Sequence, residues 1–123
     1  MGRTMQKLVF IVDDSDANLT VAACALEGEY RVLTMPSAQK MFSLLEKKKP
    51  DLILLDVEMP EISGLEAAAR LKENGQWKDI PLLFLTGYCD EKLLSEAKSS
   101  GALDVIHKPF APSELLENVR KYL

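Results

Sequence analysis

Apolar positions along the chain follow two alternating patterns. Five short runs are apolar almost without interruption, which is typical of parallel strands buried on both faces. These runs are residues 8–12, 30–35, 52–55, 81–85 and 103–107. Each is followed by a stretch in which apolar residues recur every three or four positions, as at Leu19, Ala22 and Leu26. This spacing indicates amphipathic helices, so the chain predicts five strands alternating with five helices.

Residues with capping preferences mark the expected helix ends. Ser37 and Ser113 are the expected N-caps of the second and fifth helices, and either Asp14 or Ser15 is expected to cap the first. The second helix is expected to end in the three lysines at residues 47–49, because positive charge there interacts favourably with the helix dipole.

Strict alternation of strands and helices predicts an α/β fold, with a parallel sheet covered by helices on both faces. Five strands are too few for an eight-stranded barrel. The best fit is a flavodoxin-like, doubly wound five-stranded sheet of order 2-1-3-4-5, with five helices on two faces. No linker or repeat interrupts the pattern, so residues 1–123 are expected to form a single domain.

Composition narrows the class of protein further. The 123 residues are 47% hydrophobic and 28% charged, which is ordinary for a globular domain. A net charge of −4 argues against nucleic-acid binding, which depends on basic surface. Cys24, Cys89 and the single His107 form no zinc pattern, and both cysteines are expected to be reduced. No apolar run approaches the roughly 20 residues of a membrane span, so a cytoplasmic protein is expected.

Polar residues stand at the ends of four of the five expected strands. Asp13 and Asp14 follow the first, Asp56 the third, Thr86 the fourth and Lys108 the fifth. Each alone has an ordinary explanation, such as a helix cap, a turn or a solvated lysine. Ligands of such sheets bind beyond the carboxyl ends of the strands, where the strand order reverses. Convergence at that edge therefore favours a shared site.

The charges in this site call for a cation. Two carboxylates about 4 Å apart repel by roughly 4 kcal/mol at an effective dielectric constant of 20. An all-oxygen site suits Mg²⁺, for which Mn²⁺ can substitute. With Mg²⁺ on Asp13 and Asp14, Asp56 is the expected nucleophile of a phosphoryl transfer that gives an aspartyl-phosphate. Lys108, the Thr86 hydroxyl and nearby backbone N–H groups are expected to bind phosphoryl oxygens.

These motifs resemble the receiver domain of two-component response regulators. The resemblance spans residues 7–123 and is carried by Val-Asp-Asp-Ser at 12–15, Leu-Asp-Val-Glu-Met-Pro at 55–60 with Gly64, Leu-Thr-Gly at 85–87 and Lys-Pro-Phe at 108–110. It implies phosphoryl transfer to Asp56 from the phosphohistidine of a sensor histidine kinase or a histidine phosphotransfer protein. Autodephosphorylation would follow, so the chain is not expected to be a turnover enzyme.

The resemblance also implies particular roles for individual residues. The metal ligands would be Asp13, Asp14, Asp56 and the backbone carbonyl of Glu58. Thr86 would move toward the phosphoryl group and change the surface formed by the fourth helix, fifth strand and fifth helix. The Lys108–Pro109 bond is usually cis in the family. An unknown output domain or target protein is implied, and the chain would be a stand-alone receiver or part of a longer regulator. A homodimer is left open.

One position departs from the family pattern. Receiver domains usually carry Tyr or Phe three residues before the lysine, and here that residue is Val105. A valine cannot alternate between two aromatic rotamers, so the usual relay from Thr86 is not expected. Tyr88 either supplies a substitute mobile aromatic or packs at the mouth of the site. Glu58 and Tyr88 are expected to set the lifetime of the phosphoryl group, with a sign that the residues do not predict.

Three other hypotheses compete with a phosphorylated switch. A Mg²⁺-dependent phosphatase acting through an aspartyl-phosphate typically has Asp-x-Asp after one strand, whereas Asp13 and Asp14 are adjacent and Asp56 stands alone. An FMN carrier needs a phosphate-binding loop after the first strand, and Asp-Asp-Ser-Asp at 13–16 repels phosphate without a cation. A degenerate receiver that serves only for docking is disfavoured because all five signature residues are present.

Overall fold

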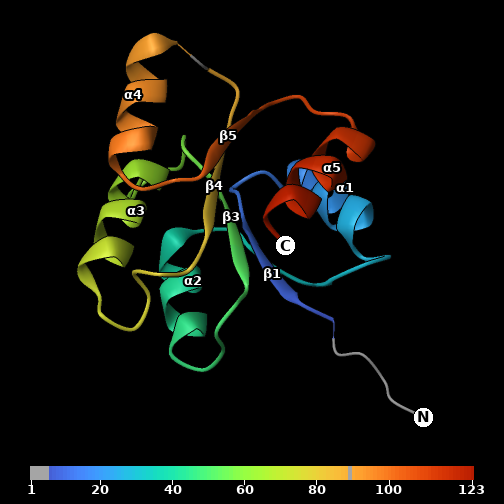
Figure 1. Ribbon diagram of the computed structural model, residues 1–123, viewed down its shortest axis with the longest axis horizontal. Coiled ribbons are helices and arrows are strands. Elements are labelled where there is room, and N and C mark those ends of the chain that lie inside the picture. The colour runs from blue at the N-terminus through green and yellow to red at the C-terminus, as the bar shows by residue number, and fades with distance from the viewer. Residues whose placement is uncertain (1–5, 89) are drawn as a thin grey trace.

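A five-stranded parallel sheet forms the centre of the protein, and helices cover both of its faces (Figure 1). The computed structural model describes residues 6–88 and 90–123. The strands are β1 (Leu8–Val12), β2 (Arg31–Met35), β3 (Leu52–Asp56), β4 (Leu82–Thr86) and β5 (Asp104–His107). The helices are α1 (Asp16–Leu26), α2 (Ala38–Leu45), α3 (Gly64–Glu73), α4 (Glu91–Ser99) and α5 (Pro112–Tyr122). The strand order β2-β1-β3-β4-β5 confirms the predicted fold.

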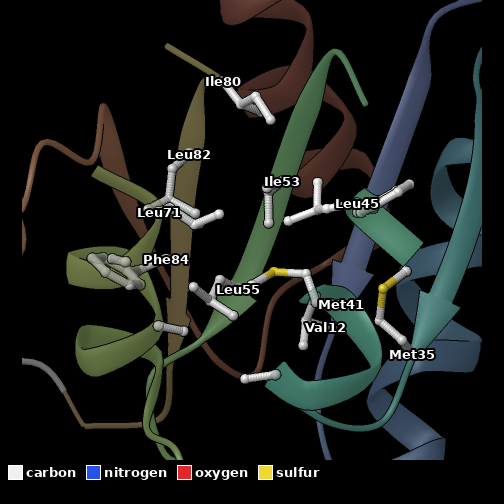
Figure 2. Close-up of a cluster of buried hydrophobic side chains, with 14 of the residues drawn as sticks. Val12, Met35, Met41, Leu45, Ile53, Leu55, Leu71, Ile80, Leu82 and Phe84 are labelled. Atoms are coloured by element: carbon white, nitrogen blue, oxygen red, sulfur yellow. The ribbon is translucent and has the colours of Figure 1, made fainter. Parts of the chain in front are cut away.

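Each face of the sheet has its own hydrophobic core. Helices α1 and α5 lie on one face, and α2, α3 and α4 lie on the other (Figure 1). Successive residues of a strand point to opposite faces, so Leu54 packs with the first group and Leu55 with the second. Figure 2 shows the second core, where Met41 of α2 lies beside Leu55 of β3 and Val12 of β1. Because both faces are covered, β1, β3 and β4 are buried throughout.

The caps of α1 and α2 follow the sequence, but two expected helix ends were wrong. Ser15 and Ser37 are N-caps, as predicted. The fifth helix begins at Pro112 instead of after Ser113, because the fixed φ of proline suits the first helical position. Its N-cap is Ala111, whose N–H donates to Glu114 Oε1 at 3.4 Å. Helix α2 ends at Leu45, so the three lysines at 47–49 lie beyond its last turn.

The connection from β3 to α3 requires a glycine. A Cβ atom on Gly64 would lie 2.2 Å from the carbonyl oxygen of Asp56 and 2.8 Å from Cα of Val57. The Gly64 N–H donates to the Val57 carbonyl at 2.8 Å, which ties the start of α3 to the end of β3. This close approach fixes the backbone that carries Asp56.

Several smaller expectations concern single groups. The Lys108–Pro109 peptide bond is cis, as the resemblance implied. Cys24 is an exposed free thiol, and Cys89 lies outside the described residues. Within residues 6–88 and 90–123, the helices are all too short or too polar to cross a bilayer.

Candidate functional site

Three carboxylates meet at the carboxyl edge of the sheet. Val12 of β1 is in register with Leu55 of β3. Asp13 directly follows Val12 and Asp56 directly follows Leu55, so the two aspartates are neighbours. Both are buried, whereas Asp14 is exposed. One oxygen from each of Asp13, Asp14 and Asp56 lies within 4.8 Å of the others. The predicted metal-binding carboxylates are therefore brought together.

Lys108 lies against the two buried carboxylates. Its Nζ is 2.9 Å from Asp56 Oδ1 and 3.3 Å from Asp13 Oδ2. The backbone N–H of Lys108 also donates to the Thr86 carbonyl at 2.7 Å, which fixes the lysine to the end of β4. Only 15% of the lysine side chain is exposed, so its ammonium group neutralises charge within the site with little screening by solvent.

The electrostatics of the site disfavour a charged Asp56 when no cation is bound. Burial raises the pKa of Asp56 to about 7, and the charges of Asp13 and Glu58 add to the increase. The hydrogen bond from Lys108 lowers the pKa of Asp56, but it does not cancel the increase from burial and from these charges. Burial would lower the pKa of Lys108, but its contacts with Asp56 and Asp13 outweigh burial and raise it. One lysine therefore does not compensate the carboxylates, and a cation would favour their charged forms.

The donor set fits a hard divalent cation. Carboxylate oxygens are the ligands that Mg²⁺ prefers, and Mg²⁺ sites in proteins commonly use one or two carboxylates and keep several waters. The exposed Asp14 leaves one side of the cluster open to solvent, which provides room for those waters and for a phosphoryl oxygen.

Thr86 and Glu58 are joined by a contact that the sequence analysis missed. Thr86 ends β4 and is fully buried. Its Oγ1 lies 2.7 Å from Glu58 Oε2 and 2.7 Å from the Tyr88 carbonyl, and it accepts from the Tyr88 N–H at 3.0 Å. Glu58 Oε1 accepts from the Gly87 N–H at 3.3 Å. Glu58 was expected to offer its backbone carbonyl to the metal and to affect the lifetime of the phosphoryl group, but its bond to Thr86 was not predicted, since nothing along the chain relates positions 28 residues apart.

Val105 and Tyr88, the two other residues considered for the switch, differ in their surroundings. Val105 of β5 is half-buried and packs against the core on the α2, α3 and α4 face. Tyr88 is 68% exposed, and its backbone carbonyl and N–H contact the Thr86 hydroxyl. His107 is also exposed.

Comparison with known proteins identifies the family. The sequence profile of the response regulator receiver domain matches residues 9–120. The chain belongs to this family. The match covers nearly the whole chain. It favours a receiver domain over the phosphatase and the FMN carrier, which are proteins of other families. Phosphorylation in two-component signalling is characteristic of receiver domains, which generally bind Mg²⁺ at an acidic pocket and interact with histidine kinases and with output domains or targets.

Individual relatives agree with this assignment. The phosphate regulon transcriptional regulatory protein PhoB of Pseudomonas aeruginosa is 38% identical over 118 residues, which are 95% of this chain and 52% of PhoB. The polar-differentiation response regulator DivK of Brucella anthropi is 28% identical, with 97% of this chain and 98% of DivK covered. The structure of the chemotaxis protein CheY4 of Vibrio cholerae has a TM-score of 0.91 at 30% identity, covering 98% of this receiver and all of CheY4. The receiver thus spans about half of PhoB and nearly all of DivK.

Proposed function

We propose that this receiver domain accepts a phosphoryl group on Asp56 from the phosphohistidine of a sensor histidine kinase or a histidine phosphotransfer protein. The observation that carries the proposal is the position of the Asp56 carboxylate, which lies beside Asp13 and Asp14 and 2.9 Å from Lys108 Nζ. Three charged groups from the ends of β1 and β5 thus surround one buried carboxylate at the end of β3. No structural role of that carboxylate would require so much uncompensated charge.

The residues divide the work of phosphoryl transfer. A carboxylate oxygen of Asp56 forms the new bond to phosphorus, and the bond from phosphorus to the histidine nitrogen breaks. Lys108 neutralises a phosphoryl oxygen as a point charge. The Thr86 hydroxyl and the Gly87 N–H, which lie at the same edge, bind the other oxygens. Positioning and charge neutralisation supply most of the catalysis in such transfers.

The metal ligands are proposed to be Asp13, Asp14, Asp56 and the backbone carbonyl of Glu58. A bound Mg²⁺, or Mn²⁺ in its place, would neutralise charge on the phosphoryl oxygens. Asp14 is the exposed member of the set, so it provides access for the ion, while Asp13 is held by Lys108 and by the Ser15 N–H at 2.9 Å.

The phosphorylated receiver is proposed to act as a switch and not as a turnover enzyme. Movement of Thr86 toward the phosphoryl group would change the surface formed by α4, β5 and α5, and autodephosphorylation would reset it. That surface would control an output domain or a separate target protein. PhoB is about twice as long as the matched segment, whereas DivK is not, so both a single-domain receiver of residues 1–123 and a longer regulator are consistent with the relatives.

Phosphorylation of Asp56 can be tested with a small phosphodonor. We expect acetyl phosphate with Mg²⁺ to add one phosphoryl group to the wild-type chain, measured by intact-protein mass spectrometry. Asp56→Asn should add none because the nucleophilic oxygen is replaced, and removal of Mg²⁺ with a chelator should abolish labelling of the wild type. Labelling of Asp56→Asn to the same extent as the wild type would overturn the assignment.

A further inference from the structure

The Glu58 carboxylate binds two donors at the edge of the site. Its Oε2 lies 2.7 Å from the Thr86 hydroxyl, and its Oε1 accepts from the Gly87 N–H at 3.3 Å. Thr86 is the last residue of β4 and Gly87 follows it, while Glu58 follows the end of β3 by two residues. The carboxylate therefore bridges two strand ends that are adjacent in the sheet.

The Thr86 hydroxyl has a single hydrogen to donate. Two acceptors compete for it at the same distance of 2.7 Å, the Glu58 carboxylate and the Tyr88 carbonyl. Hydrogen bonds to an ionised carboxylate are stronger than those to a neutral carbonyl, so Glu58 is the favoured acceptor. With the Tyr88 N–H donating to the same oxygen, the hydroxyl is fully engaged before any phosphoryl group arrives.

We propose that Glu58 is a positioning residue that holds the Thr86 hydroxyl and the Gly87 N–H in the unphosphorylated receiver and competes with the phosphoryl group for both. This inference rests on the proposed function, in which the same two donors bind phosphoryl oxygens. The carboxylate is an oxyanion, so it satisfies the donors in the way that a phosphoryl group would.

The position of the Glu58 side chain allows a phosphoryl group to replace it at the two donors. Its side chain is exposed, so it can leave the two donors for solvent without a cavity or an unpaired buried charge. Phosphorylation of Asp56 adds negative charge close to Glu58, and like charges repel. The phosphoryl group therefore both displaces the carboxylate and replaces it. Val105 supplies no aromatic ring to follow Thr86, so Glu58 is the side chain that links the hydroxyl to its neighbours.

A simpler explanation is that Glu58 acts only through its charge. A carboxylate near the site would repel an anionic phosphodonor whether or not it touched Thr86. The two explanations differ in whether the effect of Glu58 depends on the Thr86 hydroxyl. A double-mutant cycle separates them.

The cycle combines Glu58→Ala with Thr86→Val, which removes the hydroxyl and keeps the side-chain volume. Phosphorylation by acetyl phosphate is followed at Mg²⁺ concentrations that saturate each variant. In the Thr86 background we expect Glu58→Ala to accelerate phosphorylation by roughly fivefold, the factor that corresponds to one net hydrogen bond. In the Thr86→Val background the acceleration should be much smaller, and in a Thr86→Ser background it should persist because the hydroxyl is restored.

Glu61→Gln is the matched control, since it removes a carboxylate from the same loop. Glu61 is exposed and bonds to Gln39 instead of Thr86, so its substitution should leave the rate unchanged. Amide hydrogen exchange gives a second readout that needs no phosphorylation. Glu58→Ala should speed exchange of the Gly87 N–H in the unphosphorylated protein, and Glu61→Gln should not.

The outcomes separate this inference from the proposed function. Equal acceleration by Glu58→Ala with and without the Thr86 hydroxyl would overturn the inference in favour of a pure charge effect. Amide hydrogen exchange at Gly87 that is the same in Glu58→Ala and in the wild type would also overturn the inference. This result can be obtained even if Thr86→Val is too unstable to assay. Either result with normal labelling of Asp56 leaves the proposed function intact, whereas a wild-type chain that takes no label would overturn both.

Discussion

At the scale of single residues, Asp56 is a buried carboxylate whose charge the metal-free protein tolerates poorly. Burial is the largest cause of its raised pKa, and the neighbouring carboxylates increase it further. The same features make a cation favourable at the site, because binding lowers the cost of the charged form. The cost of a charged Asp56 in the metal-free protein and its tendency to bind a cation thus have the same physical cause.

The raised pKa of Asp56 predicts how stability depends on pH when no metal is bound. Folding favours the protonated form, because the pKa rises from 3.8 in the unfolded chain to about 7 in the folded protein. The stabilising contribution is fully present below pH 3.8 and is lost as pH rises through about 7. Urea unfolding with a chelator should therefore show a lower free energy of unfolding at about pH 8 than at about pH 5.

Two comparisons isolate Asp56 in this measurement. Asp56→Asn, which cannot ionise, should show a smaller loss of stability over the same pH range than the wild type. Addition of Mg²⁺ should stabilise the wild type most at the higher pH, because the ion binds the charged carboxylates. Identical pH dependence in the wild type and Asp56→Asn would contradict the assigned pKa.

At the scale of elements, the junction between β3 and α3 positions the reactive carboxylate. The parallel register between β1 and β3 places Asp56 beside Asp13, and the hydrogen bond from Gly64 to Val57 holds the following turn. The backbone of Asp56 lies where a Gly64 side chain would be, so the start of α3 packs directly against the end of β3. The precision of the site therefore depends on a residue that has no side chain.

Gly64→Ala tests this junction. The added Cβ would lie 2.2 Å from a backbone oxygen, so the substitution should lower the free energy of unfolding by about 2 kcal/mol or more. Labelling of Asp56 should also slow, because its backbone must shift. Gly28→Ala is the control, since nothing lies within 4 Å of its added Cβ. Urea unfolding and mass spectrometry measure the two effects, and equal stability of the two variants would contradict the close approach.

At the scale of the whole molecule, two hydrophobic cores share one sheet. Ile53 belongs to the core under α2, α3 and α4, and its neighbour Leu54 belongs to the core under α1 and α5. A strand cannot leave one core without leaving the other. The domain is therefore expected to unfold as a single cooperative unit, as most single domains of this size do.

Paired truncations on one strand test this cooperativity. Ile53→Ala and Leu54→Ala should each lower the free energy of unfolding by about 2–5 kcal/mol, because both side chains are fully buried. Trp77, whose ring is 5.7 Å from that of Phe42, reports by fluorescence on the core under α2, α3 and α4, while circular dichroism reports on all helices.

The two signals should give the same urea midpoint in both variants. Val21→Ala, at a side chain that is 42% exposed, should change stability by less than about 0.5 kcal/mol. Separate midpoints for fluorescence and circular dichroism in Leu54→Ala would show that the two cores unfold independently.

The pattern of residues along the chain was sufficient to predict the architecture and the members of the acidic cluster. Continuous apolar runs alternating with helical periodicity predict a covered parallel sheet, and parallel strands end at a common edge. Asp13, Asp56 and Lys108 could therefore be placed together from their positions at strand ends. Helix ends were harder to predict. Pro112 and Ser113 are adjacent and both suit the start of a helix, and the fifth helix begins at the proline.

The pairing of the side chains at that edge could not be predicted, because it depends on the folded arrangement of the strands. The bond between Glu58 and Thr86 joins residues that are distant in sequence, and it depends on which strands are adjacent and on where each side chain points. The raised pKa of Asp56 depends on burial and on charges brought in from other strands. Sequence patterns encode periodicity along the chain, whereas hydrogen bonds and desolvation depend on distances through space.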